Sequence, residues 1–81
     1  MMDTITVKYF GEIAEATNCN EEQVVTASNK LSEIIEELNK KHKLERFQLI
    51  IALNQNLVEL NDHITINNND ELAILPPFAG G

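Results

Sequence analysis

The sequence predicts an α+β fold in which one main helix covers one face of a mixed β-sheet. Three observations support this prediction. The segments follow the order strand, strand, helix, strand, short strand, strand; one apolar helical stripe lies between the second and third strands; and the last strand is apolar on both faces. A chain of 81 residues holds one domain with a single small core. One helix must therefore cover the sheet.

The first two strands are predicted to form a hairpin. In residues 4–10, Ile5, Val7 and Tyr9 alternate with polar side chains, and a period of two is typical of a half-buried strand. The second strand is predicted at residues 23–26. An irregular loop at residues 11–22 is expected between the two strands.

The main helix is predicted from residue 29 to about residue 42. Leu31, Ile34, Ile35 and Leu38 recur at helical spacing and form one apolar stripe. Ser28 stands where an N-cap is expected. The basic residues at 40–43 fall in the last turn, where positive charge offsets the negative end of the helix dipole. A phosphate-binding or partner-docking role for this basic cluster is the alternative interpretation.

The remaining strands complete the predicted sheet. Residues 49–54 and residues 71–75 are apolar on both faces, residues 57–60 are typical of a short edge strand, and residues 63–66 of a brief extended piece. A final strand that is apolar on both faces should be central, with the first strand parallel beside it. That arrangement is the β-grasp, the architecture of ubiquitin, with residues 1–75 as the domain and residues 76–81 as an extended C-terminal tail.

Charge and cysteine content narrow the choice of partners and compartment. The formal net charge of −7 and the pI of about 4.6 would repel nucleic acid and anionic membranes and favour a protein partner with a basic face, although acidity also serves solubility alone. Cys19 is the only cysteine, which excludes an intrachain disulfide and fits a cytoplasmic location. No apolar run is long enough to cross a bilayer, so no membrane partner is expected.

The sequence offers no conventional catalytic or metal-binding pattern. His42 and His63 do not form a helical pair suited to zinc, and Ser28 lacks the glycine-flanked elbow of a catalytic nucleophile. Cys19 is predicted to be inert in its acidic surroundings. The glutamates of the predicted helix, Glu33, Glu36 and Glu37, form a solvated face. We therefore expect no bound metal and no bound cofactor.

The C-terminal segment "LPPFAGG" holds the remaining chemistry. Pro76 and Pro77 have restricted φ angles and stiffen its base, whereas Gly80 and Gly81 lack a Cβ and fit a narrow channel. Residues 76–81 can reach about 20 Å when extended. The α-carboxylate at the tip needs activation, usually as an acyl-adenylate, before a nucleophile can attack it. A glycine pair at the end of a ubiquitin-like fold favours a carrier of an activated acyl group over a frayed terminus.

Three segments, "VKYFGEIAEATN", "LIIALNQNLVEL" and "NNDELAILPPFAGG", resemble the small subunits of molybdopterin synthase, which are sulfur carriers of the ThiS/MoaD family. The resemblance covers nearly the whole chain, and "DELAILPPFAGG" is its most specific part. It implies a β-grasp fold and adenylation of the Gly81 carboxylate by an adenylating enzyme that uses ATP. A sulfur donor, such as a cysteine desulfurase or a rhodanese-like protein, would then produce a thiocarboxylate.

The resemblance also implies where the sulfur goes. The tail would enter the large synthase subunit and donate sulfur to cyclic pyranopterin monophosphate, and two transfers would form the molybdopterin dithiolene within a heterotetramer. The large subunit supplies the pocket, so this chain is a reagent and is non-catalytic alone. By position, Gly81 bears the sulfur. The residues implied to contact the partner are Gly80, Ala79, Phe78, Pro77 and Pro76.

Some features permit more than one interpretation. Phe10 is expected in the core, with a partner contact as the alternative. Ala14 stands where some family members carry arginine, which puts a charge contact from the first loop in doubt.

A carrier for thiamine thiazole synthesis or tRNA thiolation would use the same tail chemistry, although thiazole-type carriers are usually shorter and lack "LPPFAGG". A ubiquitin-like modifier joined through Gly81 to lysines would also fit such a tail, and a non-catalytic binding module would make no chemical use of it.

Overall fold

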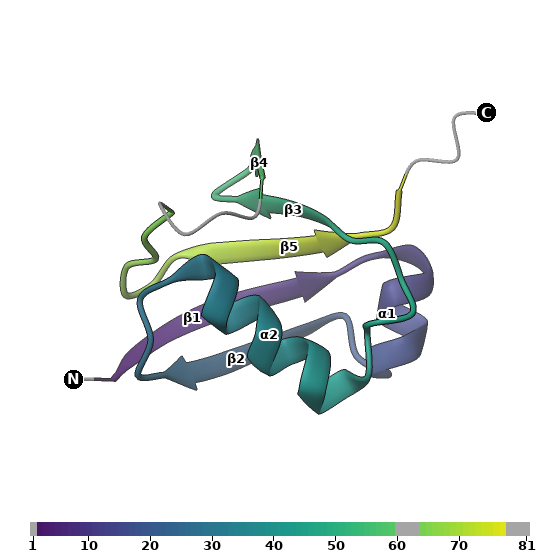
Figure 1. Ribbon diagram of the computed structural model, residues 1–81, viewed down its shortest axis with the longest axis horizontal. Helices are drawn as coiled ribbons and strands as arrows, with labels where there is room; N and C mark the ends of the chain where they lie inside the picture. The colour runs from purple at the N-terminus through teal and green to yellow at the C-terminus, as the bar shows by residue number, and fades with distance from the viewer. Residues whose placement is uncertain (1, 60–63, 78–81) are drawn as a thin grey trace.

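The computed structural model describes residues 2–59 and 64–77, which form a five-stranded sheet and two helices. The sheet order is β2-β1-β5-β3-β4; β1 and β5 are parallel, and the other neighbouring pairs are antiparallel (Figure 1). β5 is central with β1 as its parallel neighbour, so the predicted β-grasp topology is confirmed. The elements are β1 (Asp3–Tyr9), α1 (Gly11–Thr17), β2 (Glu21–Thr26), α2 (Leu31–His42), β3 (Ile50–Leu53), β4 (Asn56–Val58) and β5 (Glu71–Leu75).

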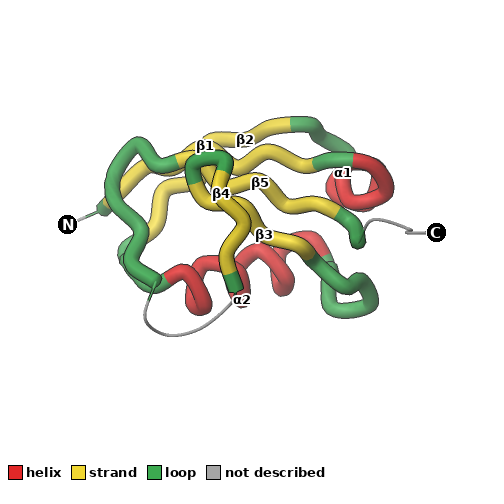
Figure 2. The backbone as a smooth tube through the Cα atoms, turned by 90° about the horizontal axis from the view of Figure 1, so that it is seen from above, coloured by secondary structure: helices red, strands yellow, loops and turns green. Residues whose placement is uncertain are grey.

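The core lies between α2 and one face of the sheet (Figure 2). Buried and partly exposed positions alternate along β1 and β5, so each strand contributes one face to the core. The predicted helical stripe is buried against these strands. The buried residues of these three elements are Ile5, Val7, Tyr9, Leu31, Ile34, Ile35, Leu38, Leu72 and Ile74.

The predicted irregular loop at residues 11–22 is wrong, because its first part forms helix α1. Ile13 and Thr17 lie one helical turn apart and are both buried. This burial stabilises a helix that is too short to form in isolation. Asn18, with a left-handed backbone at φ 60°, ends the helix.

The predicted start of the main helix is also wrong. α2 begins at Leu31, and its N-cap is Lys30, whose side chain makes no capping hydrogen bond. Lys30 instead forms an isolated antiparallel bridge with Thr65, which keeps its backbone extended. The Ser28 hydroxyl still contributes, because it accepts a hydrogen bond from the Lys30 N–H at 3.1 Å and donates one to Glu33 at 2.5 Å.

Four of the five strands differ from their predicted bounds, whereas β5 spans residues 71–75 as predicted. β1 lies one residue earlier than predicted, β2 starts at Glu21 instead of residue 23, β3 is shorter by one residue at each end, and β4 is shorter than predicted. β4 is nevertheless an edge strand, as expected. The predicted pieces at 57–60 and 63–66 lie partly outside the described residues.

Candidate functional site

The C-terminal tail leaves the sheet beside the β1–α1 turn, which Phe10 and Gly11 form. Because β1 and β5 are parallel neighbours, both end on the same side of the molecule, where α1 begins (Figure 1). The Phe10 N–H donates to the Ile74 carbonyl at 3.1 Å. Pro76 directly follows β5 and is partly buried, whereas Pro77 is exposed. We call Pro76 and Pro77 the tail root. The hydrogen bonding between the ends of β1 and β5 therefore fixes the position from which the tail root leaves the sheet.

Gly11 and Pro76 pack closely at this root. Gly11 has φ +56°, a left-handed conformation that favours glycine. A Cβ added to Gly11 would lie 3.0 Å from Cγ and 3.5 Å from Cδ of Pro76. The shorter distance is tighter than an ordinary carbon contact. Both the backbone angle and the neighbouring ring therefore favour glycine at this position.

The structure describes two of the predicted tail residues, Pro76 and Pro77. Residues 78–81, including the predicted sulfur-bearing Gly81, lie outside the described residues. The partner contacts predicted for the tail and the chemistry predicted at its tip therefore stay predictions.

The prediction that Phe10 belongs to the core is wrong, because Phe10 is 44% exposed. Alternation along β1 buries Tyr9, so the next side chain points to the other side. The N–H of Phe10 donates to the Ile74 carbonyl of β5, whereas its side chain is partly exposed. Phe10 thus provides exposed aromatic surface one residue before Gly11, which packs against Pro76.

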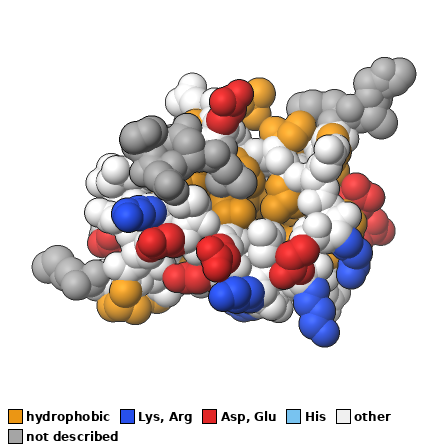
Figure 3. All heavy atoms as spheres, in the orientation of Figure 1, with side chains coloured by type: hydrophobic (Ala, Val, Ile, Leu, Met, Phe, Trp, Pro, Cys, Tyr) orange, Lys and Arg blue, Asp and Glu red, His pale blue; other side chains and the backbone are white. Residues whose placement is uncertain are grey.

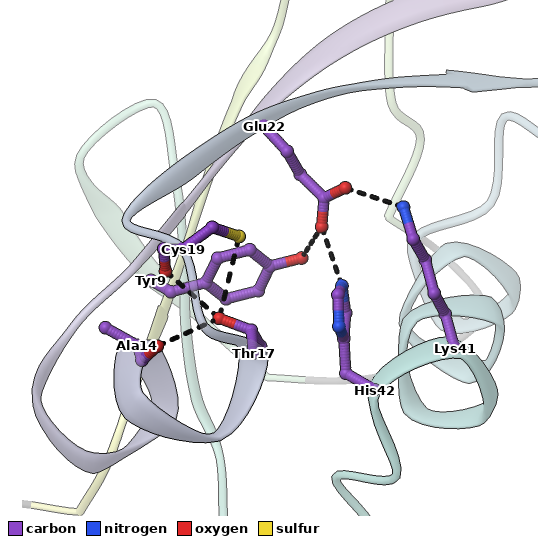
Figure 4. Close-up of polar contacts among 7 residues, drawn as sticks. All are labelled: Tyr9, Ala14, Thr17, Cys19, Glu22, Lys41 and His42. Atoms are coloured by element: carbon purple, nitrogen blue, oxygen red, sulfur yellow. Dashed lines mark hydrogen bonds and ion pairs between the residues drawn. The ribbon is translucent and has the colours of Figure 1, made fainter.

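A cluster of polar side chains joins β1, β2 and α2 (Figure 4). Oε2 of Glu22 accepts a hydrogen bond from the Tyr9 hydroxyl at 2.5 Å and lies 2.7 Å from Nε2 of His42. Oε1 of Glu22 lies 2.6 Å from Nζ of Lys41. The Tyr9 and His42 rings meet edge to face with centroids 5.5 Å apart. We call these four residues the Glu22 clasp.

The pKa shifts of Glu22 and Tyr9 indicate that the Glu22 clasp has a structural role and not a catalytic one. Burial by itself raises the pKa of Glu22, but hydrogen bonds from Lys41, Tyr9 and His42 outweigh burial and lower that pKa to about 2. Burial, followed by the hydrogen bond to Glu22, raises the pKa of Tyr9. Glu22 is therefore a carboxylate and Tyr9 a phenol at neutral pH. Neither is suited to exchange protons as a general acid or base near pH 7.

Sequence reasoning missed the Glu22 clasp. The helix dipole alone does not account for the basic residues at 40–43, because Lys41 and His42 pair with Glu22, and Lys40 pairs with Glu36 at 3.5 Å. The available signal was the period-two pattern of β2, which places Glu22 on the core side. A carboxylate at such a position needs polar partners.

The other candidate residues belong to the α1–β2 turn and to α2. Cys19 is partly buried, and its Sγ lies 3.7 Å from Oγ1 of Thr17 (Figure 4). Among the described residues, no group of three or more His, Cys, Asp or Glu is placed to hold a metal ion. A shallow depression of about 330 Å³ lies over the exposed side of α2. Its lining residues are Glu33, Glu36, Glu37 and Lys40.

The surface over α2 carries charges of both signs. Figure 3 shows acidic and basic side chains interspersed there, with hydrophobic surface above them toward β3. The three glutamates of the helix are exposed, as predicted. Within residues 2–59 and 64–77, no helix has the length and apolar character needed to span a membrane.

Comparison with known protein families matches residues 7–81 to the ThiS family. The chain belongs to the ThiS family. The match begins within β1 and includes the whole C-terminal tail, so the family pattern covers both the sheet and the predicted site. The resemblance predicted from three sequence segments is thereby confirmed.

Relatives of this ThiS-family chain agree in length and fold. The human molybdopterin synthase sulfur carrier subunit is 33% identical over 82 residues, which cover 95% of this chain and 93% of that protein. One chain in a complex of subunits 1 and 2 of the molybdopterin-converting factor from Helicobacter pylori is 31% identical, with a TM-score of 0.68 and 100% of both chains covered. The small archaeal modifier protein 1 of H. volcanii has a TM-score of 0.79 at 21% identity, covering 93% of this chain and 98% of that one; it shows the fold alone.

Proposed function

We propose that this chain is the sulfur carrier subunit of a molybdopterin synthase. The observation that carries the proposal is the similarity to the human sulfur carrier subunit, which extends over 95% of this chain. The structure is compatible with this role, because the tail begins at the end of the central strand and Pro77 is exposed. The subunit complex from Helicobacter pylori supports a large synthase subunit as the partner.

In this proposal the chemistry takes place at Gly81. On an adenylating enzyme, the Gly81 carboxylate attacks the α-phosphorus of ATP, releasing pyrophosphate and forming an acyl-adenylate. The persulfide of a cysteine desulfurase or a rhodanese-like protein displaces AMP, and a thiol then cleaves the acyl disulfide to leave a thiocarboxylate. ATP is a substrate of the activating enzyme, and this cytoplasmic chain binds no cofactor of its own.

The thiocarboxylate then delivers its sulfur inside the large subunit. Residues 76–81 reach about 20 Å when extended, and glycine at the tip fits a channel too narrow for side chains. Sulfur passes to cyclic pyranopterin monophosphate, and water restores the Gly81 carboxylate. Two transfers form the dithiolene, with two carriers serving a large-subunit dimer. The carrier is the reagent, and the catalytic side chains belong to the large subunit.

Two measurements test the proposal. The intact mass of the chain after incubation with the adenylating enzyme, ATP and the sulfur donor should show one oxygen replaced by sulfur. Adding the large subunit and the pyranopterin substrate should then yield molybdopterin and restore the original mass. A chain lacking Gly80 and Gly81 is the control; it should fold normally and show neither change. A full-length chain whose mass stays constant, or whose thiocarboxylate yields no molybdopterin, would refute the proposal.

The same experiment separates this function from the competing ones. Stable conjugates on lysines without a thiocarboxylate would indicate a protein modifier. A thiocarboxylate that supports only thiazole synthesis or tRNA thiolation would assign the chain to another pathway. Unchanged activity after removal of Gly80 and Gly81 would indicate a non-catalytic binding module.

A further inference from the structure

We infer that Gly11 is a positioning residue for the C-terminal tail, because the space left by its missing side chain sets the direction in which the chain leaves β5. The inference rests on the proposed function, since it concerns delivery of the Gly81 carboxyl group to a partner. It assigns a role to a residue far from the tail in sequence.

The β1–α1 turn is a firm support for the root of the tail. The Phe10 N–H donates to the Ile74 carbonyl at 3.1 Å, and the Phe10 carbonyl accepts from the N–H groups of Ile13 at 3.1 Å and Ala14 at 3.3 Å. The backbone of one residue thus connects β5 to the first turn of α1. The fully buried side chain of Ile13 fixes α1 to the core. The turn therefore holds a defined position relative to the end of β5.

Pro76 rests against this support. Its ring carbons are the atoms that a Cβ on Gly11 would meet, at 3.0 Å and 3.5 Å. The pyrrolidine ring also fixes the φ angle of Pro76. A fixed φ angle and a ring held against the turn leave few directions for the chain beyond Pro76. Such preorganisation lowers the conformational entropy lost when the tail enters a partner.

A side chain at Gly11 should displace the Pro76 ring and redirect the tail. In Gly11→Ala, a smaller fraction of molecules would hold the tail in the direction that the partner accepts, and apparent affinity falls with that fraction. The chemistry at the tip is unaltered. We expect the KM of the carrier for sulfur transfer to rise by about fivefold to tenfold, with kcat within about twofold of the original.

The Gly11→Asn variant distinguishes the steric contact between a new Cβ and Pro76 from the backbone strain of a positive φ angle. Asparagine adopts positive φ more readily than alanine, but it also carries a Cβ next to Pro76. If the contact between the added Cβ and Pro76 causes the rise in KM, the asparagine variant should raise KM as the alanine variant does. A normal KM for Gly11→Asn beside a raised KM for Gly11→Ala would assign the effect to strain in the turn and overturn the inference.

Pro76→Ala tests the same contact from the other side. It removes the ring carbons that a Cβ on residue 11 would meet, and by itself it should raise KM because the tail root loses its support. Gly11→Ala should then have little further effect in the Pro76→Ala background. Effects of the two substitutions that multiply independently would show that these residues do not act through one contact.

The experiment uses preformed thiocarboxylate of each full-length variant, the large subunit and the pyranopterin substrate, with carrier concentration varied. Ile5→Val is the matched control, because Ile5 is fully buried in β1 but lies in register with Val24 of β2, several residues before the β1–α1 turn; it should keep the original KM. If Ile5→Val raises KM as much as Gly11→Ala, the effect is one of stability and the inference fails. If the unmodified carrier transfers no sulfur, the proposed function fails; if it transfers sulfur and both Gly11 variants match it, the inference alone fails.

Discussion

The carboxylate of Glu22 on β2 lies 2.7 Å from Nε2 of His42 in the last turn of α2. Only 18% of the Glu22 side chain and 13% of the His42 side chain are exposed. These two side chains are therefore largely shielded from water, whereas the Lys41 side chain of the Glu22 clasp is 56% exposed. The contacts that Glu22 makes with Tyr9 and His42 should therefore stabilise the fold more than a surface ion pair does. Because Glu22 also binds Tyr9 of β1, one side chain ties an edge strand to both its neighbouring strand and the main helix.

Replacing Glu22 with glutamine should destabilise the fold. The amide keeps the shape of the carboxylate but loses the charge that Lys41 and Tyr9 contact. We expect Glu22→Gln to lower the free energy of unfolding by about 2 kcal/mol, measured by urea denaturation at neutral pH. Glu21→Gln is the control, because Glu21 is exposed on the same strand; it should change stability by no more than about 0.5 kcal/mol. Equal urea midpoints for the two variants would contradict a stabilising role for the Glu22 carboxylate.

The stability contributed by Glu22 should depend on pH. Its pKa is about 2 in the folded chain and 4.5 in ordinary conditions, so the unfolded chain takes up a proton first as the pH falls. Protonation therefore favours unfolding. The contribution is fully present above about pH 4.5 and is lost as the pH falls toward about 2.

This pH dependence is measurable as a difference between two proteins. The unfolding free energy of the unmodified chain should fall faster than that of Glu22→Gln below about pH 4.5, so the gap between them narrows. A gap that stays constant between about pH 6 and about pH 3 would show that the Glu22 charge does not stabilise the fold.

The regular elements could be predicted from sequence because each depends on a local pattern. The alternation of Ile5, Val7 and Tyr9 and the helical spacing of the stripe in α2 both determine which face is buried, and the structure confirms both. α1 could not be predicted in this way, since only Ile13 and Thr17 mark its buried face. Its stability depends on packing against strands that are distant in sequence.

For the candidate site too, the local features could be predicted from the sequence, whereas the contacts between distant residues could not. The composition of the tail, with Pro76 and Pro77 before the glycine pair, predicts a stiff base and a slender tip without any structure. The contact between Gly11 and Pro76 could not be predicted, because the predicted pairing of the first and last strands specifies neither the positive φ of Gly11 nor the position of the Pro76 ring. Pairing between distant strands also decides that Phe10 ends beside the tail root.

Truncating Ile74 should test the central position of β5. Ile74 is fully buried between sheet and helix, and Ile74→Ala should cost about 2 to 5 kcal/mol of unfolding free energy because it leaves a cavity. Leu57→Ala is the control, because Leu57 on the edge strand β4 is 69% exposed; its cost should stay within about 0.5 kcal/mol. Comparable losses in urea denaturation for the two variants would be inconsistent with the sheet order.

Truncating Phe10 should weaken partner binding more than it weakens the fold. Phe10 is 44% exposed and directly precedes Gly11, which packs against Pro76. The backbone hydrogen bond of Phe10 to Ile74 does not depend on the side chain. We expect Phe10→Ala to change the unfolding free energy by less than about 1 kcal/mol. Its affinity for the large subunit should fall by about tenfold or more, as is typical for an aromatic residue at the centre of an interface.

Titration calorimetry with the purified large subunit measures this loss of affinity. Val25→Ala is the matched control, since Val25 is 58% exposed but lies on the edge strand β2, in register with Thr4 near the start of β1 and therefore away from the tail root. It should bind the large subunit as the unmodified chain does. If Val25→Ala and Phe10→Ala lose affinity equally, or neither loses any, the docking surface does not surround the tail root. A loss confined to Phe10→Ala would place the contact where β1 and β5 end together.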